Sequence, residues 1–273
     1  MYLITRTLTV LSLVAIISVA SVAYAEHSWD GLHWARTTPS FTLKMGSNLS
    51  AVWKPYAVSA ASDWSASEVV DISIVAGKTT PKLCNPRLGR VEICNAKYGA
   101  NGWMGLTSVW TNGEHITQAT LKVNDTYFSQ RAYKTAAWRN LVMCHEMGHT
   151  LGLDHQDEDF YNTPLGTCLD YSSDPVPNQH PNQADYDQLI ASYSHLDTTT
   201  TVAGAAVPSS SALSAEVTED PSTWGKEVGR SADKRSSRFE RDLGKGNKVV
   251  THVFWVEEEK EKPEKEKSSR KDN

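Results

Sequence analysis

One short segment of this 273-residue chain has the residue types and spacing of a metal centre. Residues 145–155 read HExxHxxGxxH, with His145, Glu146, His149, Gly152 and His155 at the fixed positions. Two residues four apart share one face of a helix, so His145 and His149 can reach the same ion. Three neutral imidazoles suit Zn²⁺ and leave its fourth position open to water. Glu146 could take a proton from that water.

The glycine of this motif predicts how the third histidine arrives. A residue without Cβ readily adopts the left-handed conformation that ends a helix. We therefore expect Gly152 to turn the chain back, so that His155 becomes the third ligand. The alternative is a helix that carries these residues by chance, but five specified positions at fixed offsets favour a metal site.

Helical periodicity places the motif at the end of a long helix. Trp138, Leu141 and Val142 share a face with the first two histidines, which predicts a helix over residues 135–151. Apolar residues at helical spacing predict an earlier amphipathic helix over 51–65, and a later one is expected over Gln183–Tyr193.

Alternating and β-branched segments predict strands before the long helix. Residues 40–45 alternate, and residues 69–75 read VVDISIV. Two further strands, Gly105–Trp110 and His115–Val123, flank an Asn112-Gly113 pair, a strong signal for a hairpin turn. Strands and a helix followed by the metal-binding helix indicate an α+β fold.

The four cysteines predict two disulfides. An even number of cysteines in an exported chain suggests pairing, and four cysteines allow three connectivities. We favour Cys84–Cys94, which would close a turn-rich loop, and Cys144–Cys168, which would tie the residue before His145 to the segment beneath the metal. Zinc binding by these cysteines is the alternative, but their spacing is not CxxC.

Composition divides the chain into segments. Residues 1–25 read as a secretory signal peptide, because a short apolar run precedes an Ala-Tyr-Ala cleavage pattern; an uncleaved membrane anchor is the alternative. Residues 26–197 would form the catalytic domain, and residues 198–223 a flexible linker. Residues 224–256 could form a small β-hairpin, and the charged tail 257–273 should be disordered.

The motif resembles that of the metzincins, the zinc endopeptidases with an extended HExxHxxGxxH sequence, and the resemblance covers roughly residues 26–197. It implies that His145, His149 and His155 bind zinc and that Glu146 is the general base. The family has a methionine in a turn beneath the metal, and here Leu169 stands at that place. This exchange keeps side-chain volume. Two residues later, Tyr171 resembles a tyrosine that stabilises the oxyanion in some branches; plain packing is its alternative role.

The resemblance also implies a fold and a way of binding substrate. A metzincin-like domain has a twisted, mainly parallel sheet with an antiparallel edge strand, together with the long active-site helix. The hairpin Gly105–Val123 resembles the edge-strand region of the matrixins, and a peptide would lie extended along Gly105–Trp110. Gln156, after the third histidine, departs from the well-known branches, so the chain is best described as matrixin-like.

Other polar residues have weaker claims to function. The acidic run Asp154, Asp157, Glu158 and Asp159 could bind Ca²⁺, although a solvated loop is the simpler interpretation. His115 and His180 could line the cleft, but solitary histidines are more often structural. Asn-x-Ser/Thr patterns at residues 48 and 124 fit glycosylation acceptors.

These patterns together predict a secreted zinc endopeptidase that acts on protein or peptide substrates. With a net charge of −5 and no basic face, the chain gives no reason to expect a nucleic-acid partner. We expect a monomer with no membrane contact after signal cleavage. The alternatives are a catalytically weak binding protein with the same fold, and a zinc hydrolase of a non-peptide bond.

Overall fold

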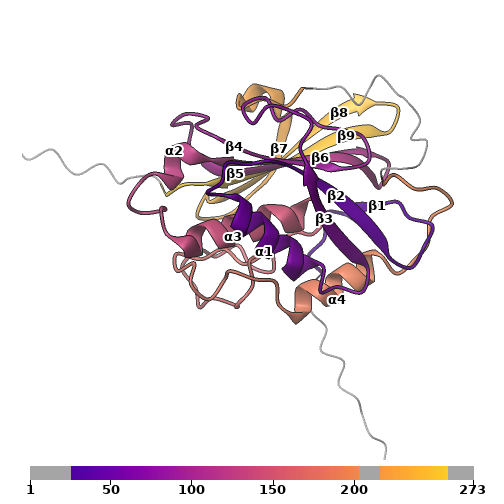
Figure 1. The fold of residues 1–273 in the computed structure, drawn as a ribbon, viewed down its shortest axis with the longest axis horizontal. Helices are drawn as coiled ribbons and strands as arrows, with labels where there is room; N and C mark the ends of the chain where they lie inside the picture. Colours follow the sequence, from indigo (N-terminus) through magenta and orange to yellow (C-terminus); the bar gives the residue numbers. More distant parts are fainter. Residues whose placement is uncertain (1–25, 203–215, 258–273) are drawn as a thin grey trace, which may run out of the picture.

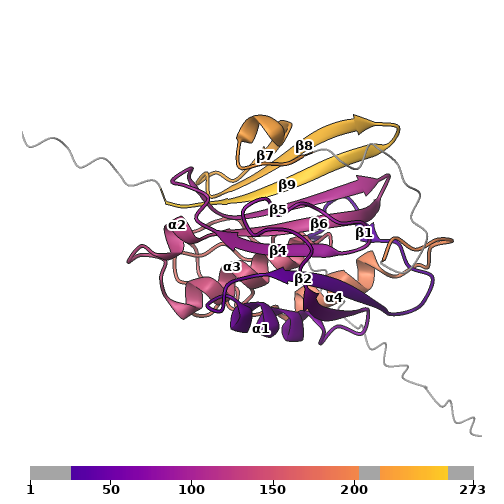
Figure 2. The same ribbon diagram turned by 45° about the horizontal axis from the view of Figure 1, so that its top comes forward.

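The computed structural model describes residues 26–202 and 216–257, so the predicted signal peptide and most of the charged tail lie outside it. The described residues form an α+β fold in which one large mixed sheet carries α1, α3 and α4 on one side (Figure 1, Figure 2). The strands are β1 (His33–Trp34), β2 (Phe41–Asn48), β3 (Val70–Ala76), β4 (Val91–Ala96), β5 (Trp103–Asn112), β6 (His115–Asn124), β7 (Lys226–Arg230), β8 (Ser236–Gly244) and β9 (Asn247–Trp255). The helices are α1 (Lys54–Trp64), α2 (Asp125–Phe128), α3 (Ala136–His149) and α4 (Gln183–Ser192), with a 3₁₀ turn at Pro221–Thr223.

The sheet has a parallel half and an antiparallel half. Its order is β3-β2-β4-β6-β5-β9-β8-β7, and β1 pairs with the start of β6. The pairs among β1, β2, β3, β4 and β6 are parallel, whereas those among β5, β6, β7, β8 and β9 are antiparallel. The predicted α+β class is confirmed, but the expectation of a mainly parallel sheet with one antiparallel edge strand is wrong.

The helix that carries the metal motif packs against α1 and the sheet. Thr135 caps the N-terminus of α3 by accepting a hydrogen bond from the Trp138 amide, which satisfies one of the unpaired amides of the first turn. The indole of Trp64, at the end of α1, donates to the Cys144 carbonyl at 3.0 Å. This buried contact fixes the two helices relative to each other one residue before His145.

The hairpin of β5 and β6 forms as its turn residues predict. Gly113 has a φ of +58°, a conformation that glycine adopts without a Cβ penalty. Val109 faces the main core between sheet and helices, while Leu106 and Trp110 enter a second core on the opposite face. Both faces of β5 are thus covered.

The C-terminal strands join this sheet and occupy the edge that was expected to be free. β9 runs antiparallel along β5 from Asn112 to Trp103, with Thr107 opposite His252 and Gly105 opposite Phe254. The predicted hairpin within residues 224–256 is present as β8 and β9, and β7 extends it. The expectation that Gly105–Trp110 is an open edge strand is therefore wrong, because β9 already forms its hydrogen bonds.

Both predicted disulfides are present. Cys84 is bonded to Cys94, and Cys144 to Cys168, which leaves no free thiol among the four cysteines. Disulfides of this kind persist in oxidising compartments. Among the described residues, no helix is long and apolar enough to cross a membrane.

Candidate metal centre

The backbone at the end of α3 brings the three motif histidines together. His145 and His149 lie one turn apart, and both are fully buried. The helix ends at His149, and Gly152 has a φ of +89°, as its place in the motif predicts. A Cβ at Gly152 would also collide with the Leu32 carbonyl, so the N-terminal segment leaves no room for a side chain there. The chain then reverses and presents His155.

The Nε2 atoms of the three histidines converge on one point. His145 and His149 are separated by 3.0 Å at Nε2, and the His155 Nε2 lies 3.3 Å from the first and 3.1 Å from the second. Zinc–nitrogen bonds of about 2.0–2.1 Å in a tetrahedron place ligand atoms roughly 3.3–3.4 Å apart. The observed separations are close to this geometry.

The other ring nitrogen of each histidine has its own acceptor. Nδ1 of His145 donates to the Cys168 carbonyl at 2.7 Å, and Nδ1 of His149 donates to the Leu153 carbonyl at 2.8 Å. Nδ1 of His155 donates to Glu158 Oε1 at 2.9 Å. Such contacts keep the proton on Nδ1 and direct the Nε2 lone pair toward a metal. Burial also lowers the pKa of His145 and His149 well below the usual histidine value, which favours the neutral form. The donor set therefore fits Zn²⁺.

Glu146 lies beside this cluster in a fully buried position. Its Oε2 accepts a hydrogen bond of 2.6 Å from the Thr107 hydroxyl, while Oε1 has no hydrogen-bond partner. Burial raises the pKa of Glu146 to about 8, and the Thr107 hydrogen bond opposes that shift. A carboxylate with one unpartnered oxygen next to a metal site is suited to accept a proton.

The turn that was expected beneath the metal packs against α3 beside the histidine cluster. Leu169 is fully buried, and a Cβ on Gly148 would be 3.0 Å from its Cδ2 atom, so the leucine packs against α3 between the two helical ligands. The preceding residue, Cys168, supplies the carbonyl that orients His145 and is bonded to Cys144. Leucine thus fills the space under the site, as the volume argument predicts.

Tyr171 borders the centre but points its hydroxyl at another histidine. Its ring lies 5.1 Å from that of His145 and 4.8 Å from that of His155, centroid to centroid. Its hydroxyl is 2.9 Å from His252 Nε2, and burial raises the tyrosine pKa well above its usual value. The side chain is therefore neutral, and in this conformation its partner is His252.

His252, on β9, is the member of the centre that the sequence did not indicate. Each of His145, His149, His155 and His252 offers a ring nitrogen within 4.8 Å of the others. The Nε2 of His252 faces Tyr171, and its buried Nδ1 has no hydrogen-bond partner and lies 3.5 Å from Glu146 Oε2. No local motif surrounds His252. Only the alternation of β9 and its register on β5 bring this side chain inward.

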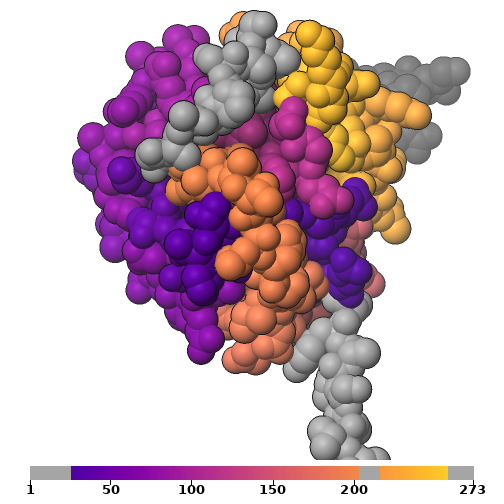
Figure 3. All heavy atoms as spheres, turned by 90° about the vertical axis from the view of Figure 1, so that its right-hand side faces the viewer, coloured from indigo at the N-terminus to yellow at the C-terminus, as the bar shows by residue number. Residues whose placement is uncertain are grey.

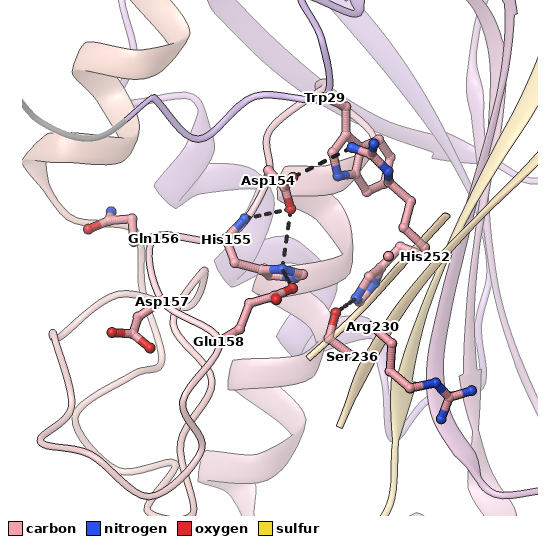
Figure 4. Close-up of a pocket in the computed structure, with 11 residues that line it drawn as sticks. Trp29, Asp154, His155, Gln156, Asp157, Glu158, Arg230, Ser236 and His252 are labelled. Atoms are coloured by element: carbon pink, nitrogen blue, oxygen red, sulfur yellow. Dashed lines mark hydrogen bonds and ion pairs between the residues drawn. The ribbon is translucent and has the colours of Figure 1, made fainter. Parts of the chain in front are cut away.

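A polar pocket opens beside His155. Figure 4 shows His252 facing His155 across it, with Glu158 reaching the His155 ring. Its walls come from the segment after α3 and from β7, β8 and β9, and they include the charged residues Asp154, Glu158, Arg230 and Arg238. Trp29 also lines it and stacks on His149 with ring centroids 4.7 Å apart. Solvent thus reaches the centre from the side of its third ligand.

The weaker sequence candidates lie elsewhere or have structural partners. Glu158 holds the His155 ring, which gives one member of the acidic run a role other than calcium binding. His180 is exposed and pairs with Asp63 at 2.8 Å. The amide of Asn124 is buried and donates to two backbone carbonyls, and that of Asn48 donates to Glu92. Those contacts occupy the amides that glycosylation would modify.

Comparison with models of protein families found no match. A comparison with curated proteins found none either. The assignment of a function therefore depends on the geometry of the centre itself.

Proposed function

We propose that this protein is an exported zinc-dependent endopeptidase, with His145, His149 and His155 as the zinc ligands. The observation that carries the proposal is the convergence of three Nε2 atoms whose Nδ1 partners fix the tautomer. Zinc, when bound there, would polarise the scissile carbonyl and acidify water. The motif itself and the turn at Leu169, which packs against α3, support the resemblance to metzincins. The predicted signal peptide and the two disulfides support export.

Glu146 would act as the general base in this proposal. Its carboxylate would take a proton from the attacking water and pass it to the leaving amine. Thr107 holds Oε2, which leaves Oε1 as the oxygen available for proton transfer. Tyr171 would hydrogen-bond the oxyanion only after its hydroxyl leaves His252.

The position of β9 makes the conformation described here a closed form of that enzyme. An extended peptide would bind by adding a strand to β5, and β9 already takes that place. Phe254 covers the His145 ring at a centroid distance of 5.0 Å, and His252 faces the ligands. A peptide substrate would therefore have to displace β9, at least where β9 pairs with residues Gly105 to Thr107 of β5.

His252 also favours a second candidate function. A zinc site with four protein ligands is typical of structural zinc, whereas a catalytic site keeps a position for water. If His252 binds the metal permanently, the protein is a metzincin-like binding protein with a closed centre. The pocket beside His155 would then be its ligand-binding surface.

One experiment separates these functions. The mature chain and a His252→Ala/Phe254→Ala variant would be loaded with zinc, and cleavage of casein and of a quenched peptide library measured with and without a chelator. We expect chelator-sensitive cleavage that is faster in the variant. Zinc binding without cleavage in both proteins would support the closed binding protein, and an absence of zinc binding would refute both candidates.

A further inference from the structure

A second cluster of possible metal-binding side chains lies outside the centre on α3. It combines His33 from β1, His115 from the first residue of β6, and His195 and Asp197 from the segment after α4. In Figure 3 that orange segment lies against indigo N-terminal residues and beside the magenta end of the β5–β6 hairpin. Three regions distant in sequence thus meet here, and none of these residues belongs to the centre on α3.

The ligand atoms have the spacing of a metal site. The Nε2 atoms of His33 and His195 are 3.3 Å apart, and they lie 3.4 Å and 3.7 Å from Asp197 Oδ1. The Nε2 of His115 is 3.1 Å from the same oxygen. Tetrahedral zinc spaces its ligand atoms roughly 3.3–3.4 Å apart. His33, His195 and Asp197 fit that spacing, and His115 contacts the carboxylate of Asp197 beside them.

Hydrogen bonds outside the cluster determine which atoms face its centre. The Nδ1 of His33 is 2.7 Å from the Gly31 carbonyl, which can only accept, so Nδ1 carries the proton. With Nδ1 as the donor to Gly31, Nε2 of His33 is the ring nitrogen that faces the carboxylate oxygen and could bind a metal. Asp197 Oδ2 accepts from the Arg36 amide at 2.9 Å, which turns Oδ1 toward the histidines. A divalent cation placed between these atoms would bind His33 Nε2 and Asp197 Oδ1 together.

We propose that His33, His195 and Asp197, with His115 beside them, bind a divalent metal such as Zn²⁺ at a second, structural site. The buried partners are His33 and Asp197, with 2% and 7% of their side chains exposed, while 53% of His195 is exposed. The metal would fasten β1 to the segment that follows α4. Because Trp29, just before β1, stacks on His149, the second site would also hold the N-terminal segment over the first. This inference does not depend on the proposed peptidase activity.

Zinc stoichiometry tests the proposal. The mature chain would be freed of metal, titrated with ZnCl₂ against a chromophoric chelator, and assayed for bound zinc after gel filtration. We expect two equivalents for the unaltered chain and one for His195→Ala, where the side chain is exposed and its removal leaves no cavity in the core. His33→Ala should also bind one, whereas His180→Ala, altered at an exposed histidine paired with Asp63, should keep two.

The same titration identifies which site each equivalent occupies. A His145→Ala/His149→Ala variant should retain one equivalent, and adding His195→Ala to it should remove that one. Zn²⁺ should raise the thermal midpoint of the His145→Ala/His149→Ala variant but not that of the triple variant, because only a folded second site gains from binding. If the unaltered chain binds one equivalent of zinc and His195→Ala binds the same amount, the proposal is overturned. Hydrogen bonds and ion pairs between the histidines and Asp197 would then account for the cluster.

Discussion

At the scale of single residues, the centre depends on which ring nitrogen carries each proton. The Cys168 and Leu153 carbonyls and the Glu158 carboxylate hold the three Nδ1 protons, so the Nε2 atoms are free to bind metal. Glu146 is not among the three histidines and, in the proposed enzyme, would transfer protons. Ligation and proton transfer can therefore be separated by substitution.

Glu146→Gln should abolish hydrolysis and spare the metal. Glutamine keeps the size of the side chain and can still pair with Thr107, but it cannot take a proton from water. We expect peptide cleavage to fall by at least about 10²-fold with zinc content unchanged. Atomic absorption on the same samples used for kinetics would check both parts. Undiminished cleavage in this variant would assign the base to another residue.

The disulfide beneath the centre supports a ligand directly. Cys168 is bonded to Cys144 and also supplies the carbonyl that orients His145. A Cys144→Ser/Cys168→Ser variant should lose about 3 kcal/mol of unfolding free energy and bind zinc more weakly. Urea unfolding and chelator competition measure the two effects. Cys84→Ser/Cys94→Ser is the matched control, because that bond lies away from the centre, and it should leave zinc affinity unchanged.

At the scale of elements, the sequence predicted those with strong local patterns. α3, α4 and the β5–β6 hairpin lie where periodicity and the Asn112-Gly113 pair placed them, within a few residues. β4 was not predicted, because Glu92 is buried in that strand against Arg90, and a buried ion pair hides the apolar pattern. The pairing of β9 with β5 could not be predicted either, since strand register between distant segments has no local signal.

The same limit applies to the centre. The three motif histidines and Glu146 were identifiable because they share one helix and its turn. His252 lies 107 residues beyond His145 in the sequence, on a strand with ordinary alternation. Only the register that sets Thr107 opposite His252 brings it to the metal ligands. Motif analysis therefore could not identify His252 as a member of the centre.

His252→Ala should open the centre. Removing this ring frees a position beside the three ligands and releases the Tyr171 hydroxyl. We expect zinc to remain bound and cleavage of short peptides to rise about tenfold, which corresponds to a barrier lower by roughly 1.4 kcal/mol. The absorption of a Co²⁺-substituted sample separates the two candidate functions, because it changes only if His252 is a permanent ligand that the substitution removes. His180→Ala, at an exposed histidine outside the centre, should alter neither measurement; an unchanged spectrum in His252→Ala would show that His252 does not bind the metal.

At the scale of the whole molecule, β7, β8 and β9 belong to the structure that surrounds the centre. Val250 and Phe254 are buried in the main core, and Val249 and Val253 in the second core with Trp224. The second core also includes Trp103, Leu106 and Trp110 of β5. The segment after residue 197 was expected to be a linker followed by a marginal hairpin. Paired with β5, that hairpin gains the neighbours that a free hairpin lacks.

Truncation tests whether these strands are required for stability. Burial of one large apolar side chain contributes about 1.5–3 kcal/mol, so losing four of them removes an amount comparable with the net stability of a domain, about 5–15 kcal/mol. A chain ending at Val202 should therefore melt at a much lower temperature, and its exposed β5 edge should promote association. Circular dichroism and gel filtration would show both changes.

A chain ending at Glu257, which lacks only residues 258–273, is the matched control and should behave as the full chain does. A synthetic peptide of residues 246–257 added to the shorter chain should restore part of the lost stability by pairing with β5. A cooperative melt at the unaltered temperature would instead support a catalytic domain that ends at residue 197.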